Sequence, residues 1–154
     1  MNIRAMRRMA AGLLLGLLSL PAVASCGEEP KKHFPGAFPG THTDVSAAKA
    51  FRDFGLDVPA SAKVVGYYAW SADDEYPMAA VLWMPCPAVS GFVSGSGLRN
   101  ASSRDGAIAG VQAFARDHGW TDGDEDERYL RDGDEPVGVL THRTGTECKV
   151  YVHT

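Results

Sequence analysis

The alternation of apolar and polar residues predicts a β-hairpin in the first half of the chain. Residues 63–70 and 78–84 are rich in valine, tyrosine, tryptophan and other strand-forming residues, and the polar segment 71–77 separates them. Two apolar runs joined by a short polar turn are typical of antiparallel strands that are neighbours in a sheet. We therefore expect these runs to pair.

Three other segments carry apolar residues at helical spacing, every three or four positions. The strongest has Ile108, Val111 and Phe114 on one side, which predicts an amphipathic helix. Polar residues suited to capping begin these segments, or a proline does, and glycines end them. The expected helices are bounded by Asp44 and Gly55, by Pro85 and Gly95, and by Ser102 or Ser103 and Gly119.

Three short strands are expected in the last third of the chain, at 127–131, 137–142 and 147–153. In the last of these, Cys148, Val150 and Val152 alternate with Lys149, Tyr151 and His153, so the two sets point to opposite faces. Together with the hairpin, these segments predict an α+β fold. Its expected form is a two-layer sandwich, an antiparallel sheet of about five strands with two to three helices packed on one face.

The N-terminus has the pattern of an export signal. Arg4, Arg7 and Arg8 precede an apolar run that ends near Leu20, which is too short to favour an uncleaved membrane span. The following residues, Val23-Ala24-Ser25-Cys26, resemble the lipobox of bacterial prolipoproteins. That resemblance implies diacylation of the Cys26 thiol, cleavage before it, and an extracytoplasmic protein anchored to the membrane. The alternative is an ordinary secretory signal cut after Ala24 or Ser25.

The sequence divides into a signal peptide at 1–25, a lipidated flexible tether at 26–43 and one globular domain at 44–154. Three prolines and three glycines in 27–43 leave no periodicity for burial, and they include the repeat Phe34-Pro35-Gly36-Ala37-Phe38-Pro39-Gly40. Such a composition is typical of linkers. We expect the fold to begin near Asp44.

The net charge and the cysteine content limit which partners the protein is expected to bind and in which compartment it is expected to fold. The formal net charge is −4, and cleavage of the signal would remove three arginines, so nucleic acid is not expected as a partner. If Cys26 carries lipid, Cys86 and Cys148 are the remaining cysteines of an exported chain and are expected to form a disulfide. The alternative is two buried free thiols.

Several short motifs lie in the part of the chain that follows the predicted tether: Phe54-Gly55-Leu56, Val58-Pro59-Ala60, the hairpin, Phe92, Ser96-Gly97-Leu98 and Gly119-Trp120. They resemble those of small lipoproteins of unknown function from streptomycetes and related actinobacteria. The similarity covers most of the mature chain and implies a cell-surface location and a similar fold. It implies no activity, so no catalytic residue can be carried over.

The acidic segment 122–127 is the one candidate for metal binding. Asp122, Asp124 and Asp126 match the first three ligand positions of a calcium loop, but Glu127 stands where that loop requires glycine. Solvated loops are the simpler interpretation, with weak calcium binding as the alternative. No other cofactor is expected.

Tyr67, Tyr68 and Trp70 concentrate aromatic side chains on the hairpin and form the candidate binding surface, because exposed aromatic residues bind glycans or protein partners. The expected function is a non-enzymatic binding or accessory module of the cell envelope. One rival is an envelope-acting hydrolase that uses His118 or His142 with an acidic partner from 122–127. Another is an inhibitor or immunity-type module.

Overall fold

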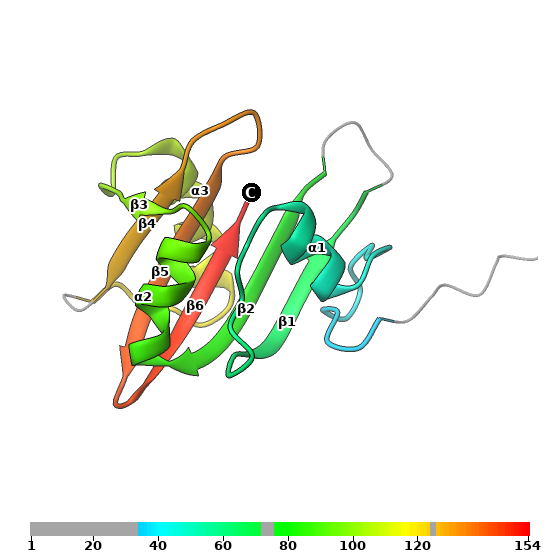
Figure 1. Cartoon of the computed structure of the whole chain (residues 1–154). Helices are drawn as coiled ribbons and strands as arrows, with labels where there is room; N and C mark the ends of the chain where they lie inside the picture. The colour runs from blue at the N-terminus through cyan, green and yellow to red at the C-terminus, as the bar shows by residue number, and fades with distance from the viewer. Residues whose placement is uncertain (1–33, 72–75, 124–125) are drawn as a thin grey trace, which may run out of the picture. The chain divides into compact units, whose positions relative to one another are not determined.

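The computed structural model describes residues 34–71, 76–123 and 126–154 (Figure 1). The predicted signal peptide, the lipobox and Cys26 lie outside these residues. No helix in the described part of the chain is long and apolar enough to cross a membrane. The elements are α1 (Ala47–Asp53), β1 (Lys63–Ala69), β2 (Met78–Pro85), α2 (Cys86–Gly95), β3 (Arg99–Asn100), α3 (Gly106–Asp117), β4 (Glu127–Arg131), β5 (Val137–Thr144) and β6 (Glu147–His153).

The strands form one antiparallel sheet in the order β1-β2-β6-β5-β4-β3. The predicted α+β class with an antiparallel sheet is therefore confirmed. The C-terminal strand β6 lies at the centre, where Met84 of β2 pairs with Cys148. Cys86, the first residue of α2, is joined to Cys148 by a disulfide with a Cα–Cα distance of 4.9 Å, as the cysteine count predicts.

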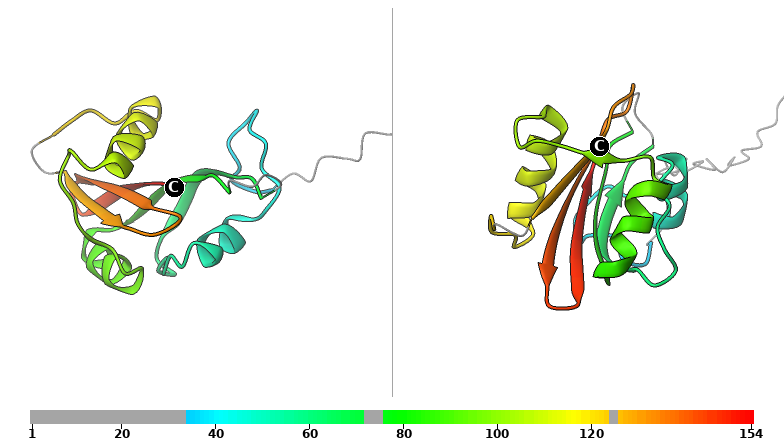
Figure 2. Two further views of the ribbon diagram at one scale, coloured as in Figure 1. Left: turned by 90° about the horizontal axis from the view of Figure 1, so that it is seen from above. Right: turned by 60° about the vertical axis from the view of Figure 1, so that its left-hand side comes forward.

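Helices cover both faces of the sheet, so the prediction that they pack on one face is wrong (Figure 2). We call the face under α1 and α2 the first face and the face under α3 the second face. The central strands are apolar on both sides: Leu82 and Val150 belong to the core of the first face, and Val81 and Tyr151 to that of the second. A sheet with two apolar faces must bury both, and one layer of helices cannot do so.

Helix starts differ from those predicted because the expected caps are used elsewhere. Ser46, not Asp44, caps α1 by accepting a hydrogen bond from the Lys49 backbone N–H. The Asp44 carboxylate instead accepts hydrogen bonds from the backbone N–H and hydroxyl of Ser71. Similarly, α3 begins after Asp105 rather than at the predicted serines.

Residues 34–43 are folded against the domain, which contradicts the prediction of a flexible tether for this part of the chain. The Phe-Pro-Gly repeat forms two turns, in which the Ala37 N–H donates to the Phe34 carbonyl and the Thr41 N–H to the Phe38 carbonyl. The glycines of the two turns have φ of 81° and 79°. Proline followed by a glycine with positive φ is the signature of a type II turn. We call residues 34–43 the N-terminal clip.

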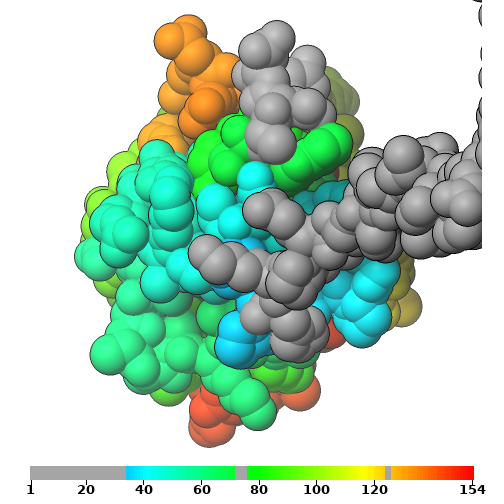
Figure 3. Space-filling model, turned by 90° about the vertical axis from the view of Figure 1, so that its right-hand side faces the viewer, coloured from blue at the N-terminus to red at the C-terminus, as the bar shows by residue number. Residues whose placement is uncertain are grey.

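The clip holds the edge strand β1 from both sides. The Phe38 N–H donates to the Tyr67 carbonyl at 2.8 Å, and the Tyr67 N–H donates to the Gly36 carbonyl at 3.1 Å. Phe34 packs against the core of the first face and Phe38 against that of the second. Gly66 makes room for Phe38, since a Cβ there would lie 2.1 Å from its ring. Figure 3 shows the clip in blue and cyan at the surface.

Candidate functional site

A groove of about 700 Å³ opens on the second face between the clip and α3. Four separate parts of the chain line it: the clip, β1, α3 with the residue that caps its C-terminus, and the end of β6. None of these is adjacent to the next in sequence. The lining residues are Phe38, Pro39, Thr41, Tyr68, Gly110, Ala113, Phe114, Asp117, His118 and His153.

Small residues shape the floor of the groove. Tyr68 pairs with Ala79, and Ala79 pairs with His153, so the methyl group of Ala79 separates two large side chains on the two strands that flank β2. Gly110 of α3 lies over His153, where a Cβ would approach the imidazole Nδ1 to 3.3 Å. The absence of a side chain at Gly110 lets the imidazole sit directly against the helix.

His118 is fixed in position by the aromatic wall of the groove. Its ring centroid lies 4.5 Å from that of Phe38 and 4.3 Å from that of Phe114. Its Nδ1 donates a hydrogen bond to the Phe114 carbonyl oxygen at 2.8 Å, because a carbonyl can only accept. In the neutral ring, the other nitrogen, Nε2, is therefore a hydrogen-bond acceptor.

Burial keeps two other polar groups of the groove uncharged near neutral pH. Desolvation lowers the pKa of His153 and raises the pKa of Tyr68. Neither side chain makes a hydrogen bond with any residue that the structure describes. No lysine or arginine lines the groove, and Asp117 supplies its one carboxylate. The groove therefore offers neutral hydrogen-bonding groups beside aromatic rings and disfavours anions.

The three aromatic residues predicted as a binding surface do not act together. Tyr67 is fully buried and its hydroxyl donates to the Val45 carbonyl at 3.1 Å, so its place on an exposed surface was a wrong prediction. Trp70 lies outside the groove and stacks on His42 with ring centroids 5.7 Å apart. Only Tyr68 lines the groove.

Sequence reasoning missed Phe38, Phe114 and His153 as groove residues. The composition of the repeat that contains Phe38 predicts a linker, and the helical spacing of Phe114 predicts a core position. Their proximity depends on the clip folding back onto β1. The one available signal was the repetition itself, because Phe-Pro-Gly favours a defined turn.

A second feature of interest is a histidine–carboxylate pair between β5 and the loop before β4. His142 Nδ1 lies 2.8 Å from the Asp126 carboxylate, whose side chain is 0% exposed. The same carboxylate accepts hydrogen bonds from the indole N–H of Trp120 and the backbone N–H of Gly123, each at 2.9 Å. The pair joins one histidine of the predicted hydrolase to an acid from 122–127, while His118 is bonded to a backbone carbonyl instead.

The contacts of the acidic segment leave few carboxylate oxygens free to bind a calcium ion. Asp122 forms an ion pair with Arg128 at 3.0 Å, and Asp126 has both oxygens occupied by protein donors. Asp124, the third predicted ligand, lies outside the described residues. Within residues 34–71, 76–123 and 126–154, no group of three histidine, cysteine or acidic side chains could hold a metal ion.

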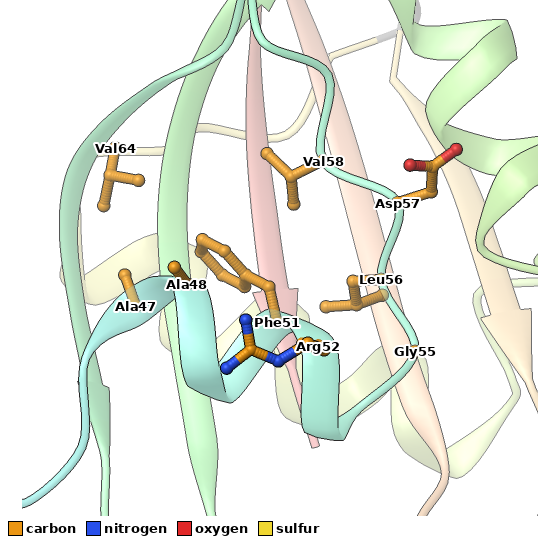
Figure 4. Close-up of a pocket in the computed structure, with 9 residues that line it drawn as sticks. All are labelled: Ala47, Ala48, Phe51, Arg52, Gly55, Leu56, Asp57, Val58 and Val64. Carbon is orange, nitrogen blue, oxygen red and sulfur yellow. The ribbon is translucent and has the colours of Figure 1, made fainter.

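A cleft of about 620 Å³ lies on the first face between α1, the loop that follows it and β1 (Figure 4). Its walls are mostly aliphatic and aromatic. Figure 4 shows Phe51, Leu56 and Val58 pointing toward one another, with Arg52 beside Phe51.

Comparison with known proteins found no match among protein-family models, curated proteins or solved structures.

Proposed function

We propose that this protein is a lipid-anchored binding module of the cell envelope, and that the groove on the second face binds a neutral, hydroxyl-rich ligand such as an envelope glycan. The observation that carries the proposal is the convergence of Tyr68, His118 and His153 in a groove walled by Phe38 and Phe114. A few polar groups placed among aromatic side chains are typical of small-ligand sites.

A glycan fits the groove better than a charged ligand does. Sugar hydroxyls both donate and accept hydrogen bonds, which matches the Tyr68 hydroxyl and the two imidazoles. The apolar edges of a sugar ring can pack on the phenyl rings. A phosphate or carboxylate would meet Asp117 with no cation among the lining residues.

Variants of the groove test this proposal through binding of the full-length protein to isolated envelope polysaccharide. We expect Tyr68→Ala to weaken binding about 5- to 150-fold, the effect of losing 1 to 3 kcal/mol at a buried aromatic contact. The matched control is Trp70→Ala, which removes an aromatic residue next to the same strand but outside the groove. Equal affinities for wild type and Tyr68→Ala would contradict the proposal.

The proposed anchoring rests on the basic N-terminal segment and on the lipobox sequence that ends at Cys26. Only seven residues lie between Cys26 and Phe34, so an extended linker would keep the clip within about 30 Å of the membrane surface. Cys26→Ser should release the protein from membranes or block its processing. Unchanged membrane partition with normal cleavage would show that Cys26 is not the anchor.

The His142–Asp126 pair favours a hydrolase as the second candidate. A buried carboxylate that accepts a hydrogen bond from Nδ1 holds the imidazole in one tautomer, as in enzymes where histidine acts as a general base. Asp126→Asn and His142→Gln would abolish such an activity while leaving polysaccharide binding intact. Loss of biological function in these folded variants, with Tyr68→Ala silent, would favour catalysis over binding.

A further inference from the structure

The cleft on the first face has an apolar interior that the fold leaves open. Phe51 and Leu56 form its floor, each with 6% of its surface exposed. Ala47, Val58 and Val64 form its walls and are only partly buried. Because α1 ends at Asp53 and the chain turns back at Gly55, with φ of 59°, no helix of the described part of the chain covers these side chains. The cleft is therefore lined mainly by hydrocarbon.

Arg52 is the one positively charged residue among those that line this cleft. It is exposed, and its guanidinium makes no hydrogen bond or ion pair with any described residue. Figure 4 shows this guanidinium next to the Phe51 ring. Guanidinium binds carboxylate and phosphate groups through paired hydrogen bonds.

The one acidic lining residue points elsewhere. The Asp57 backbone N–H donates to the Ser96 hydroxyl at 2.9 Å, which fastens this residue to the end of α2. Its carboxylate lies against Gly95, where a Cβ would come within 2.3 Å of Oδ2. Figure 4 shows the carboxylate directed away from Phe51. The charge next to Phe51 is therefore positive.

We infer that this cleft binds the hydrocarbon chain of an amphipathic anion, with its carboxylate or phosphate held by Arg52. The hydrocarbon chain would pack against the apolar walls. The Arg52 guanidinium, which has no partner among the described residues, would bind the anionic head group. Two sources share this chemistry, a free fatty acid and an anionic phospholipid. The inference is independent of the groove on the opposite face and of what that groove binds.

Photocrosslinking tests the inference with the full-length protein in phosphatidylcholine vesicles. The probe is dodecanoate with a diazirine at the end of its chain, and dodecanol with the same diazirine is the neutral comparison. Labelled peptides are mapped by mass spectrometry. We expect the label on residues 47–64, with at least fivefold less from dodecanol than from dodecanoate.

Two variants separate the charge from the cavity. Arg52→Gln should reduce labelling by dodecanoate to the level of dodecanol, while Arg104→Gln, which removes another exposed arginine far from the cleft in sequence, should leave it unchanged. Ala48→Trp should block the opening and reduce labelling by both probes. The far-ultraviolet circular dichroism of each variant is compared with wild type, so that only folded proteins are scored.

Competition identifies the source of the ligand. If phosphatidylglycerol in the vesicles displaces the label, the natural ligand is a phospholipid; if only added free dodecanoate does so, it is a fatty acid. Labelling spread evenly over the surface would overturn the inference. So would cleft labelling that is equal for both probes and unchanged by Arg52→Gln. Polysaccharide binding, measured on the same samples, shows whether the groove is affected.

Discussion

The two faces of the sheet are covered in different ways. The first face carries two helices, and its core runs through Phe51, Phe92 and Val150. Of the described helices, only α3 packs on the second face, with Phe38 of the clip beside it. The Cys86–Cys148 disulfide ties α2 to β6 on the first face, whereas no disulfide links α3 to the sheet.

This difference decides what each face exposes. On the first face, a short helix leaves an apolar cleft with one arginine beside it. On the second face, the gap between a helix and a chain segment leaves a groove with imidazole and phenol groups. One sheet can therefore present two chemically distinct recesses, because its strands are apolar on both sides and each side is closed by different elements.

Removal of the disulfide on the first face should reduce the stability of the protein more than a substitution at Gly138, Phe38 or His153. The bridge closes a loop with a sequence separation of 62, and the chain-entropy model assigns about 4 kcal/mol to a loop of this size. Cys86→Ala with Cys148→Ala should lower the free energy of unfolding in urea by about that amount. Reduction of the wild-type protein should reproduce the loss, and a change below about 1 kcal/mol would contradict it.

On the second face, Gly138→Ala tests how closely α3 packs on β5. A Cβ at Gly138 would lie 2.4 Å from the carbonyl oxygen of Ala107, so the helix must move. We expect a loss of about 2 to 3 kcal/mol in urea unfolding. The control is Gly91→Ala in α2, which has nothing within 4 Å of its Cβ and should be neutral or stabilising by up to about 1 kcal/mol. Similar results for the two variants would show that α3 is not held this closely.

The clip joins the two faces at the edge of the sheet, and Phe38→Ala should weaken that link. Because Phe38 is half-buried, we expect a loss of about 2 kcal/mol, below the 3 to 5 kcal/mol of a fully buried phenylalanine. Hydrogen exchange of the Tyr67 amide, which donates to Gly36, should accelerate. The corresponding change on the first face, Phe34→Ala, is the comparison. Unchanged exchange at Tyr67 in both variants would show that the clip does not protect β1.

The smallest effect concerns pH and the second face. Burial lowers the folded-state pKa of His153 below its usual 6.5, so protons bind the unfolded state more readily. The contribution of neutral His153 is intact above pH 6.5 and is lost as the pH falls through 6.5 toward the folded-state pKa. Between pH 7.5 and pH 5, the free energy of unfolding should decrease more for wild type than for His153→Gln.

His42→Gln, which changes an exposed histidine, should behave like wild type in that comparison. Asp117, His118 and Tyr68 share the groove with His153, so each variant is measured at both pH values. An identical loss in wild type and His153→Gln would exclude a contribution from this histidine.

Local sequence patterns are sufficient to predict most of the helices and strands and the cysteine pairing. The ranges 127–131 and 147–153 match β4 and β6, and the hairpin matches β1 and β2 within a few residues. These predictions succeed because residue alternation and turn composition act over a few positions. The two-residue strand β3 was not predicted, since so short a segment carries no period.

Long-range packing determines which faces of the sheet the helices cover and which distant side chains come into contact. Packing on both faces depends on the position of β6 between β2 and β5. The groove depends on the clip folding back to Tyr67. The approach of Asp126 to His142 likewise follows from the β4–β5 register. Each of these contacts joins residues far apart in the chain. Their proximity is set by strand order and packing rather than by any local pattern.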